Sequence, residues 1–416
     1  MLSSVQKAFM EIVECSMEGK KREKLNITGP EQITELMDMA KEQHMLPMVY
    51  DVIAHADCGR ECTEIINRYK VQAVVLMMQQ TQRAKMFFKI YNVLLEKGIK
   101  PIVVKGAVIR SMYKNPDCRC SNDEDILIEK SEFFKCHEIL IEEGYECETK
   151  YHILKENIPY EVAYFNRSTK LRIEIHTALL PENSNAFEGL NRQLKGIFES
   201  AQLKNIGPGE VWTLSDTQHF LFLLSHSYKH FVYCGFGIRQ LCDLLMMAEK
   251  CRKTIDWDYI EKSAAENRIY RFLINLIDIG EQYLGFDGNR LPLRYKQKIK
   301  PDSGNLLEDM LQAGVFGKSN AGRIHSANIT MNAVHKSFIH KNVRLSVVNS
   351  VFPSLSYMKQ NFSYLNKNIY LLPLAYCQRL AAYLRERKIR AAYGEPVDSI
   401  TVGRKRIALM RQYGII

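Results

Sequence analysis

Two aspartates, Asp123 and Asp125, stand one residue apart at the start of a short apolar run that continues to Ile128. Because side chains alternate along a β-strand, both carboxylates are expected on one face of the strand. Neighbouring carboxylates repel each other and lose hydration, so they are a costly structural choice unless divalent cations lie between them. The pair is a candidate metal site, although Asp-x-Asp pairs also occur in turns without a metal.

A third carboxylate is available on a second strand-like run, Leu171–His176, in which apolar and polar residues alternate. Glu174 and His176 fall on one face of it. If the two strands are neighbours, Glu174 lies beside Asp123 and Asp125, which gives the ligand set of two-metal nucleotidyl transfer. These three carboxylates are the expected catalytic and metal-binding residues; an exposed strand with alternating polar residues is the alternative for Glu174. Oxygen ligands and substrate phosphates favour Mg²⁺, for which Mn²⁺ can substitute.

A phosphate-binding turn is predicted just upstream. The β-branched run Pro101–Lys105 ends at Gly106, where helical spacing begins. A helix N-terminus offers unpaired N–H groups to a phosphate, and glycine lets the phosphate approach the backbone closely. Lys105, Arg110 and Arg119 can add positive charge. Each of these basic residues alone would be read as a surface charge, but here they occur in the order that a triphosphate site requires.

Two histidines four residues apart, His226 and His230, are expected on one face of a helix. Three interpretations remain open for them. They can bind zinc, although no third ligand is evident nearby and Asp243 can instead orient one of them. They can line the nucleotide cleft, or they can be structural. We take His230, together with His176, as a candidate nucleotide contact, and leave the roles of His226, Asp243 and Arg239 open.

The hydrophobic periodicity indicates which elements position these residues. Helical spacing dominates residues 1–95, short strands and helices alternate over 96–205, and helical spacing returns over 206–416. The expected fold is therefore α+β, with a small mixed-sheet core between helical regions. Ser215 is a plausible helix cap, and the glycine-rich stretch Ser303–Arg323 is expected to be a mobile connection. The expected strands are 101–105, 123–128, 152–154, 160–165 and 171–176.

The composition is that of a globular protein. The chain has 416 residues, 46% of them hydrophobic and 25% charged. Its apolar runs are too short to span a membrane, and no signal-peptide core is evident, so we expect a cytoplasmic protein that does not contact membranes. The eleven cysteines are expected to be reduced, and neither Cys58/Cys62 nor Cys118/Cys120 has the second pair that a zinc site needs.

The motifs resemble a known family. The run from Val104 to Tyr113, followed by Arg119 and the acidic strand, is similar to the bacterial uncharacterised nucleotidyltransferase family of the DNA polymerase beta-like superfamily. Glu174-Ile-His176 matches its third-carboxylate strand, with Thr177 in place of the usual tryptophan. Many members of the superfamily have Gly-Ser where this chain has Lys105-Gly106, so the lysine is expected to take over part of the phosphate binding.

The resemblance extends into the helical part of the chain. His226, His230, Arg239 and Asp243 resemble the family's His-x3-His helix and the Asp-bearing helix that follows it. The similarity covers most of residues 30–390 and is strongest from Lys105 to His176. It implies an enzyme that transfers a nucleoside monophosphate from an NTP to an acceptor hydroxyl. The acceptor, which can be a small molecule, a peptide or protein side chain or an RNA end, is not indicated, nor are the preferred NTP and the oligomeric state.

Two other functions are compatible with the sequence. A nucleotide-binding regulatory module with little turnover needs the same pocket, although the presence of all three carboxylates counts against it. A nucleic-acid-binding protein is suggested by the formal net charge of +10 and by basic residues near the C-terminus, among them Arg379, Arg385 and the run Arg404–Arg406. The charges lack an accompanying aromatic pattern, so a solvated helix face is the favoured interpretation of them.

Overall fold

The computed structural model describes residues 2–416 except 28, 149–157, 183, 185, 295–297, 315–320, 339–354, 356–357, 360–361, 367 and 393–398. The expected strand at 152–154 lies outside the described residues.

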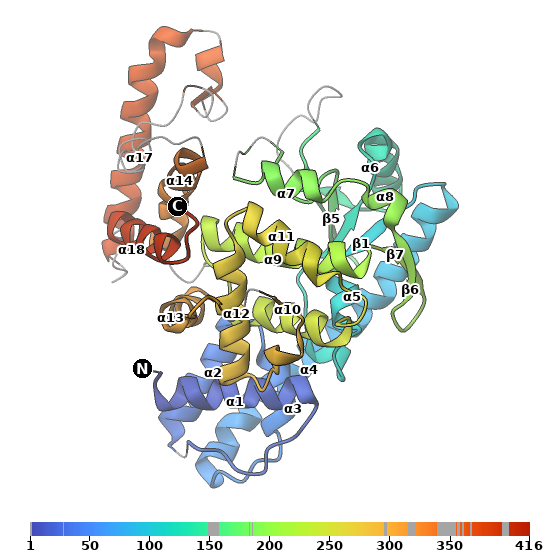
Figure 1. Ribbon diagram of the computed structural model, residues 1–416, viewed down its shortest axis with the longest axis vertical. Helices are drawn as coiled ribbons and strands as arrows, with labels where there is room; N and C mark the ends of the chain where they lie inside the picture. Colours follow the sequence, from blue (N-terminus) through green and yellow to red (C-terminus); the bar gives the residue numbers. More distant parts are fainter. Residues whose placement is uncertain are drawn as a thin grey trace.

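Helices form the N-terminal part of the chain, which occupies the bottom of the view in Figure 1. The first begins at a capping box, in which the Ser3 side chain accepts a hydrogen bond from the Gln6 backbone N–H. The last is 37 residues long, and its C-terminal half buries Phe87, Tyr91 and Leu94 against the sheet. These helices are α1 (Ser4–Glu18), α2 (Pro30–Glu42), α3 (Leu46–Ile53) and α4 (Arg60–Glu96).

One mixed sheet follows, and its described strands lie in the order β3-β4-β5-β2-β1-β7-β6. The central strand β2 runs parallel to β5 and antiparallel to β1, and β1 runs parallel to β7. The strands are β1 (Ile102–Val104), β2 (Glu124–Leu127), β3 (Glu146–Cys147), β4 (Glu161–Asn166), β5 (Leu171–His176), β6 (Gln202–Asn205) and β7 (Glu210–Thr213). The helices between them are α5 (Gly106–Arg110), α6 (Phe133–Glu142), α7 (Glu188–Gln193) and α8 (Ile197–Ser200).

Both faces of the sheet are covered, as the apolar residues at successive positions of its central strands require. Val103 and Ile126 pack with α4 and α6, whereas Ile102 and Leu127 belong to the larger core formed with the C-terminal helices. Because side chains alternate, Asp125 shares its face with Leu127 and therefore points toward those helices.

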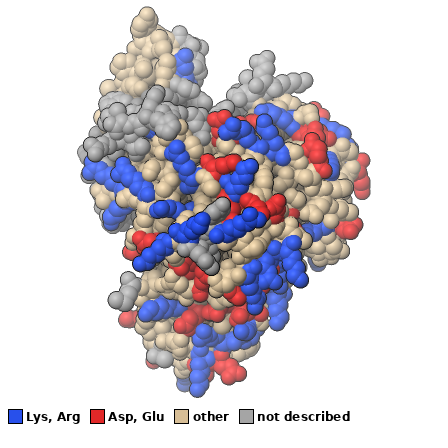
Figure 2. Space-filling view, viewed as in Figure 1, with Lys and Arg blue, Asp and Glu red and all other residues tan. Residues whose placement is uncertain are grey.

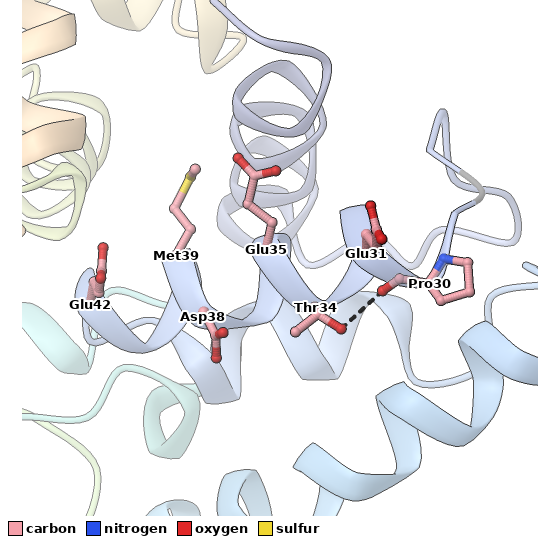
Figure 3. Close-up of a pocket in the computed structure, with 7 residues that line it drawn as sticks. All are labelled: Pro30, Glu31, Thr34, Glu35, Asp38, Met39 and Glu42. Carbon is pink, nitrogen blue, oxygen red and sulfur yellow. Dashed lines mark hydrogen bonds between the residues drawn. The ribbon is translucent and has the colours of Figure 1, made fainter.

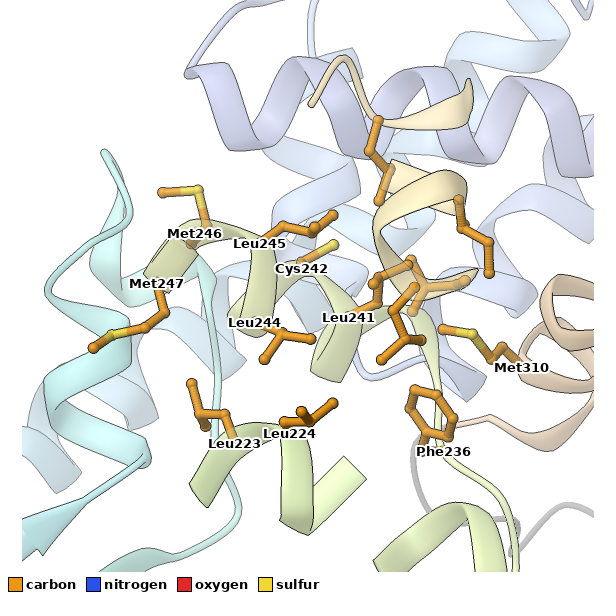
Figure 4. Packing of buried hydrophobic residues seen from close by; sticks show 14 of the residues in the cluster. Leu223, Leu224, Phe236, Leu241, Cys242, Leu244, Leu245, Met246, Met247 and Met310 are labelled. Atoms are coloured by element: carbon orange, nitrogen blue, oxygen red, sulfur yellow. The ribbon is translucent and has the colours of Figure 1, made fainter. Parts of the chain in front are cut away.

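The C-terminal helices begin at Ser215, whose side chain caps α9 by accepting a hydrogen bond from the Gln218 N–H, as predicted. Figure 4 shows Leu224 of α9 and Leu244 of α10 directed toward each other in the packed core. The C-terminal helices are α9 (Asp216–Tyr233), α10 (Ile238–Lys250), α11 (Trp257–Glu266), α12 (Tyr270–Tyr283), α13 (Gly304–Ala313), α14 (Ala321–Phe338), α17 (Leu372–Ala392) and α18 (Ser399–Gln412). Of these, α14, α17 and α18 lie at the upper left of Figure 1, on the side away from the sheet.

The α+β fold is confirmed, with two corrections to its details. Residues 304–313 form α13, with Leu306 and Met310 buried, so the expectation of a mobile connection there is wrong. The strands β3, β6 and β7 were not anticipated, and the sheet continues to Thr213, beyond the expected end of the core at residue 205. Of the helices described, none combines the length and the apolar character needed to cross a bilayer.

Candidate functional site

The acidic residues meet where β2 and β5 run side by side. Asp125 lies opposite Glu174 in the parallel register, and Leu127 lies opposite His176. One ligand atom each from Asp125, Glu174 and His176 lies within 4.8 Å of the others. Within the part of the chain that the structure describes, no other group of three potential metal ligands is this close. Asp123 is outside this group but lines the same pocket.

The pocket is a cavity of about 240 Å³ between the sheet and two helices. The sheet and the segments around it contribute acidic and basic residues to its lining, whereas α9 and α10 contribute two histidines and two basic residues among other side chains. The lining residues from the sheet side include Lys105, Gly106, Arg119, Asp123, Asp125, Glu161, Arg172 and Glu174. Those from the helices include His226, Lys229, His230, Arg239 and Asp243.

Lys105 is the cation closest to the carboxylates. Its Nζ lies 2.8 Å from Asp125 Oδ1 and 3.0 Å from His226 Nε2. Its backbone has a positive φ of 54°, which is rare outside glycine, and its N–H donates to His219 Nε2 at 3.1 Å. Burial alone would lower the pKa of Lys105, but the charge of Asp125 and its neighbours outweighs that effect and raises it. The ammonium is therefore charged and partly neutralises the acidic cluster.

The three carboxylates still carry more negative charge than one lysine can balance. Burial, and then the charges of Asp125 and Asp123, raise the pKa of Glu174 to about 8. Burial, and then Asp125, also raise the pKa of Asp123. For Asp125 burial acts in the same direction, but Lys105 and His176 outweigh it and lower the pKa. Carboxyl groups with shifted pKa values cluster at functional sites, and the oxygen atoms of these three suit Mg²⁺ or Mn²⁺.

His176 lies behind the cluster. Its Nε2 is 3.0 Å from Asp125 Oδ1, and the residue is only 2% exposed. It is not among the residues that line the pocket, so the geometry does not support the expected direct contact with a nucleotide. An imidazole in this position fixes the orientation of the Asp125 carboxylate, as outer partners of metal ligands do.

Arg110 faces away from the pocket. Its guanidinium donates to Glu124 Oε1 at 2.8 Å and to Ser121 Oγ at 2.9 Å, and the residue is 4% exposed. The structure thus corrects the expectation that Arg110 binds the triphosphate. Gly106 is needed for the same arrangement, because a Cβ at this position would lie 2.3 Å from Glu124 Oε2. Its backbone lines the pocket, but α5 has only five residues and offers a weak helix dipole to a phosphate.

Arg119 lines the pocket and is held by an aspartate from α10. Its Nε donates to Asp243 Oδ1 at 3.0 Å and its Nη2 to Asp243 Oδ2 at 2.5 Å, and the Tyr113 hydroxyl donates to Oδ1 at 2.9 Å. Asp243, whose role the sequence left open, thus pairs with Arg119. Sequence spacing could not reveal this pair, because 124 residues separate its members.

The two histidines of α9 contact each other and Lys105. His226 Nε2 lies 3.2 Å from His230 Nε2. Burial, and then nearby positive charges such as Lys105 for His226 and Lys229 for His230, lower the pKa of both far below the ordinary value, so both rings are neutral at pH 7. Among the described residues no third ligand joins them, which leaves no support for a zinc site. Both line the pocket, and for His230 this agrees with a role in the cleft.

Sequence reasoning did not single out Glu161, Arg172 and Lys229. Lys229 Nζ lies 3.7 Å from Glu161 Oε2 across the pocket, and Arg172 contacts Glu174 at 3.4 Å and Glu148 at 2.7 Å. A usable signal for Lys229 was its spacing of three residues from His226 on the same helix. Around Glu161 and Arg172 the sequence shows only the alternation of polar and apolar residues that is ordinary for a strand, which does not mark either as a site residue.

A larger hollow of about 650 Å³ runs along α2, and Figure 3 shows its lining. The acidic side chains Glu31, Glu35, Asp38 and Glu42 are spread along the helix, and no basic residue accompanies them. This hollow lacks groups that can hold phosphates, so the pocket at the strand pair is the better candidate.

Two comparisons with known proteins bear on this site. A family model described as "Uncharacterised nucleotidyltransferase" matches residues 29–285. The matched region includes every residue discussed above as lining the pocket at the strand pair. No curated protein matches the chain.

Proposed function

The chain belongs to the uncharacterised nucleotidyltransferase family, and on that premise we propose that it transfers a nucleoside monophosphate from an NTP to an acceptor hydroxyl. In this reaction the hydroxyl oxygen bonds to the α-phosphorus, the bond from that phosphorus to the bridging oxygen breaks, and pyrophosphate leaves. The observation that carries the proposal is the cluster of Asp125, Glu174 and His176, whose two carboxylates line a pocket that also has basic walls.

Asp123, Asp125 and Glu174 fit Mg²⁺, with Mn²⁺ as a substitute, because all three offer carboxylate oxygens inside one pocket. Bound divalent ions would supply Lewis-acid activation of the acceptor hydroxyl and neutralise charge on the phosphates. The raised pKa keeps Glu174 protonated at pH 7 in the metal-free protein; a bound cation would displace that proton, and the resulting carboxylate can accept the hydroxyl proton. His176 holds Asp125 in place from behind.

The proposed contacts to the triphosphate are the side chains of Lys105, Arg119 and His230 and the backbone of Gly106. All four line the pocket. The strained backbone of Lys105, fixed by His219, directs its ammonium toward Asp125 and away from solvent. We further propose that the chain belongs to the DNA polymerase beta-like superfamily, that it acts in the cytoplasm, and that its sheet-containing core works between two separate helical regions.

The decisive experiment incubates the purified protein with each α-labelled NTP, Mg²⁺ or Mn²⁺, and cell extract as the source of acceptor. We expect label on an acceptor with the wild type and none with the Asp123→Asn/Asp125→Asn variant. Glu146→Gln is the matched control, because Glu146 lies on β3 of the same sheet but outside the pocket and is exposed. It should transfer label at the wild-type rate.

One observation favours a regulatory module as the second candidate. Lys105 already occupies Asp125 Oδ1, so it can balance part of the charge that a metal would otherwise balance. A module of this kind would bind one NTP in a metal-dependent way and transfer no label. Absence of any nucleotide binding would exclude both functions.

A further inference from the structure

Arg239 of α10 differs from the other cations that line the pocket. Lys105, Arg119, Arg172 and Lys229 each lie within 4.0 Å of a carboxylate oxygen. No carboxylate among the described residues lies that close to Arg239, which is 7% exposed and donates from Nη1 to the backbone carbonyl of Cys120 at 2.6 Å.

Two guanidinium nitrogens at this end of the pocket lack a hydrogen-bond partner. They are Arg239 Nε and Arg119 Nη1, both fully buried in residues more than nine-tenths buried. Asp243 takes up Nε and Nη2 of Arg119 and so leaves Nη1 unused. Burial, and then the charge of Arg119, lower the pKa of Arg239 to about 10. Two buried cations with unused donors are costly unless an anion lies against them.

The dimensions and lining of the pocket narrow down the anion. A cavity of about 240 Å³ is smaller than the roughly 300–1,000 Å³ of sites that enclose a drug-sized ligand. Apart from Leu223, the side chains that line it are polar or charged, and none of them is a Phe, Tyr or Trp ring that would offer a nucleobase a large stacking surface. The pocket therefore suits phosphate groups, because two oxygen atoms of one phosphate can accept parallel hydrogen bonds from a guanidinium.

The carboxylates and the arginines line the same pocket. The phosphorus under attack must lie at the metal-binding carboxylates, and Arg239 of α10 is an electrostatic neighbour of one of them, Asp123. The phosphates that leave need a separate cationic contact, because their negative charge increases as the bond breaks.

We propose that Arg239 and Arg119 form a binding site for the pyrophosphate part of the substrate, that is, for its β- and γ-phosphates. This proposal rests on the proposed nucleotidyl transfer and assigns one of its subsites. Asp243 is then a positioning residue, since it holds Arg119 at the pocket through Nε and Nη2 and leaves Nη1 unused. The site makes the protein selective for triphosphates over monophosphates.

Isothermal titration calorimetry at one fixed Mg²⁺ concentration tests the proposal, with magnesium pyrophosphate and AMP as the probes. Replacing Arg239 by methionine removes one charged hydrogen-bonding partner, so pyrophosphate should bind about tenfold to hundredfold more weakly. AMP should bind as it does to the wild type. Arg239→Lys should recover only part of the pyrophosphate affinity, because a lysine lacks the Nε donor. Thermal unfolding of each variant shows whether it is folded.

Arg172→Met is the matched control, because it removes one positive charge from the same pocket but from an arginine that has carboxylate partners. Equal losses of pyrophosphate affinity in Arg172→Met and Arg239→Met would overturn the proposal, and so would a wild type that does not bind magnesium pyrophosphate. If the wild type transfers label while Arg239→Met keeps its pyrophosphate affinity, this inference fails and the proposed function stands. If pyrophosphate binding depends on Arg239 but no NTP is used, the proposed function fails and the anion site stands.

Discussion

At Asp125 Oδ1 two nitrogen atoms converge, Lys105 Nζ at 2.8 Å and His176 Nε2 at 3.0 Å. Both nitrogens stabilise the ionised form of Asp125. Glu174 and Asp123 instead have raised pKa values, because burial and the neighbouring carboxylates disfavour their ionised forms. The difference between the three carboxyl groups arises largely from their partners, since all three line one pocket. It also indicates which of them must change protonation when a cation binds.

Glu174 is expected to release a proton when a divalent cation binds. With a pKa of about 8 it is mostly protonated at pH 7, and a cation favours the carboxylate form. Metal affinity should therefore rise up to about tenfold per pH unit below pH 8 and level off above it. Calorimetric titration of Mn²⁺ in buffers of different ionisation enthalpy measures the released protons.

The sign of the linked stability effect is opposite in the metal-free protein. A raised carboxyl pKa means that the folded chain holds a proton which the unfolded chain has released, so the unfolding free energy falls as the pH rises from about 4.5 to about 8. Glu174→Gln should lose the Glu174 contribution to both pH dependences. Proton release that is unchanged in Glu174→Gln would contradict this assignment.

At the scale of single residues, strand alternation was enough to predict that Asp125 and Glu174 line the same pocket, because alternation alone fixes the face of a side chain. It could not show that Arg110 turns inward to Glu124 or that Arg119 meets Asp243. Both pairs depend on how separate elements pack, and a basic residue near a glycine turn has the same sequence signature in either case.

At the scale of elements, α5 and β2 are joined by a buried ion pair. The side chains of Arg110 and Glu124 are 5% and 2% exposed, and Ser121 Oγ contacts both. The pair fixes the short helix against the strand that carries Asp125. Its position explains why the chain has glycine at 106, where any side chain would meet the Glu124 carboxylate.

Arg110→Met is expected to destabilise the protein without removing a substrate contact. It leaves Glu124 buried without its charged partner, which costs about 3–5 kcal/mol of unfolding free energy. Urea denaturation measures that loss. In conditions where the variant is folded, its affinity for magnesium pyrophosphate should stay within about twofold of the wild type, because the side chain is outside the pocket. A stable variant that has lost pyrophosphate binding would restore the original expectation that Arg110 binds phosphate.

The elements that were predicted well have strong local signals. The β-branched residues of β1 and the alternation of β5 left little ambiguity, and β5 spans the predicted residues Leu171–His176. In contrast, β6 consists of Gln202–Asn205 and has mostly exposed side chains, so only its pairing with β7 makes it a strand. For α13 the glycines at 304 and 314 suggested a loop, but they lie at the two ends of a helix with a buried apolar face.

At the scale of the whole molecule, separate parts of the chain converge on the pocket. From α4, Gln80 accepts from the Ser121 N–H and Arg83 donates to the Ser121 carbonyl, so the N-terminal helices support the segment before β2. The C-terminal helices support α9 from its other side, because Thr330 of α14 donates to the carbonyl of Val232. The site thus depends on segments that lie outside the sheet.

The basic C-terminal residues do not all serve one surface. Arg406 is 2% exposed, and its guanidinium donates to the carbonyls of Phe231 and Tyr233 and to Ser326 Oγ. Figure 2 shows basic and acidic side chains interspersed over the visible face, without a large area of one sign. Both observations weigh against a nucleic-acid-binding surface built on these charges.

Arg406 is instead expected to stabilise the C-terminal end of α9, the helix that carries His226, Lys229 and His230. A cation at a helix C-terminus satisfies the last carbonyls and interacts favourably with the helix dipole. Arg406→Met leaves the carbonyls of Phe231 and Tyr233 without this donor, so the unfolding free energy should fall by about 2–4 kcal/mol, as for a buried charged hydrogen bond network. Arg404→Met, in an exposed position of the same helix α18, should change it by less than about 0.5 kcal/mol.

Urea denaturation of both variants compares the two losses, and calorimetry at a temperature where both are folded should give wild-type affinity for magnesium pyrophosphate. If Arg406→Met were as stable as Arg404→Met, the C-terminal helices would not support the pocket through this contact, and the basic run would again be available for a partner with negative charge.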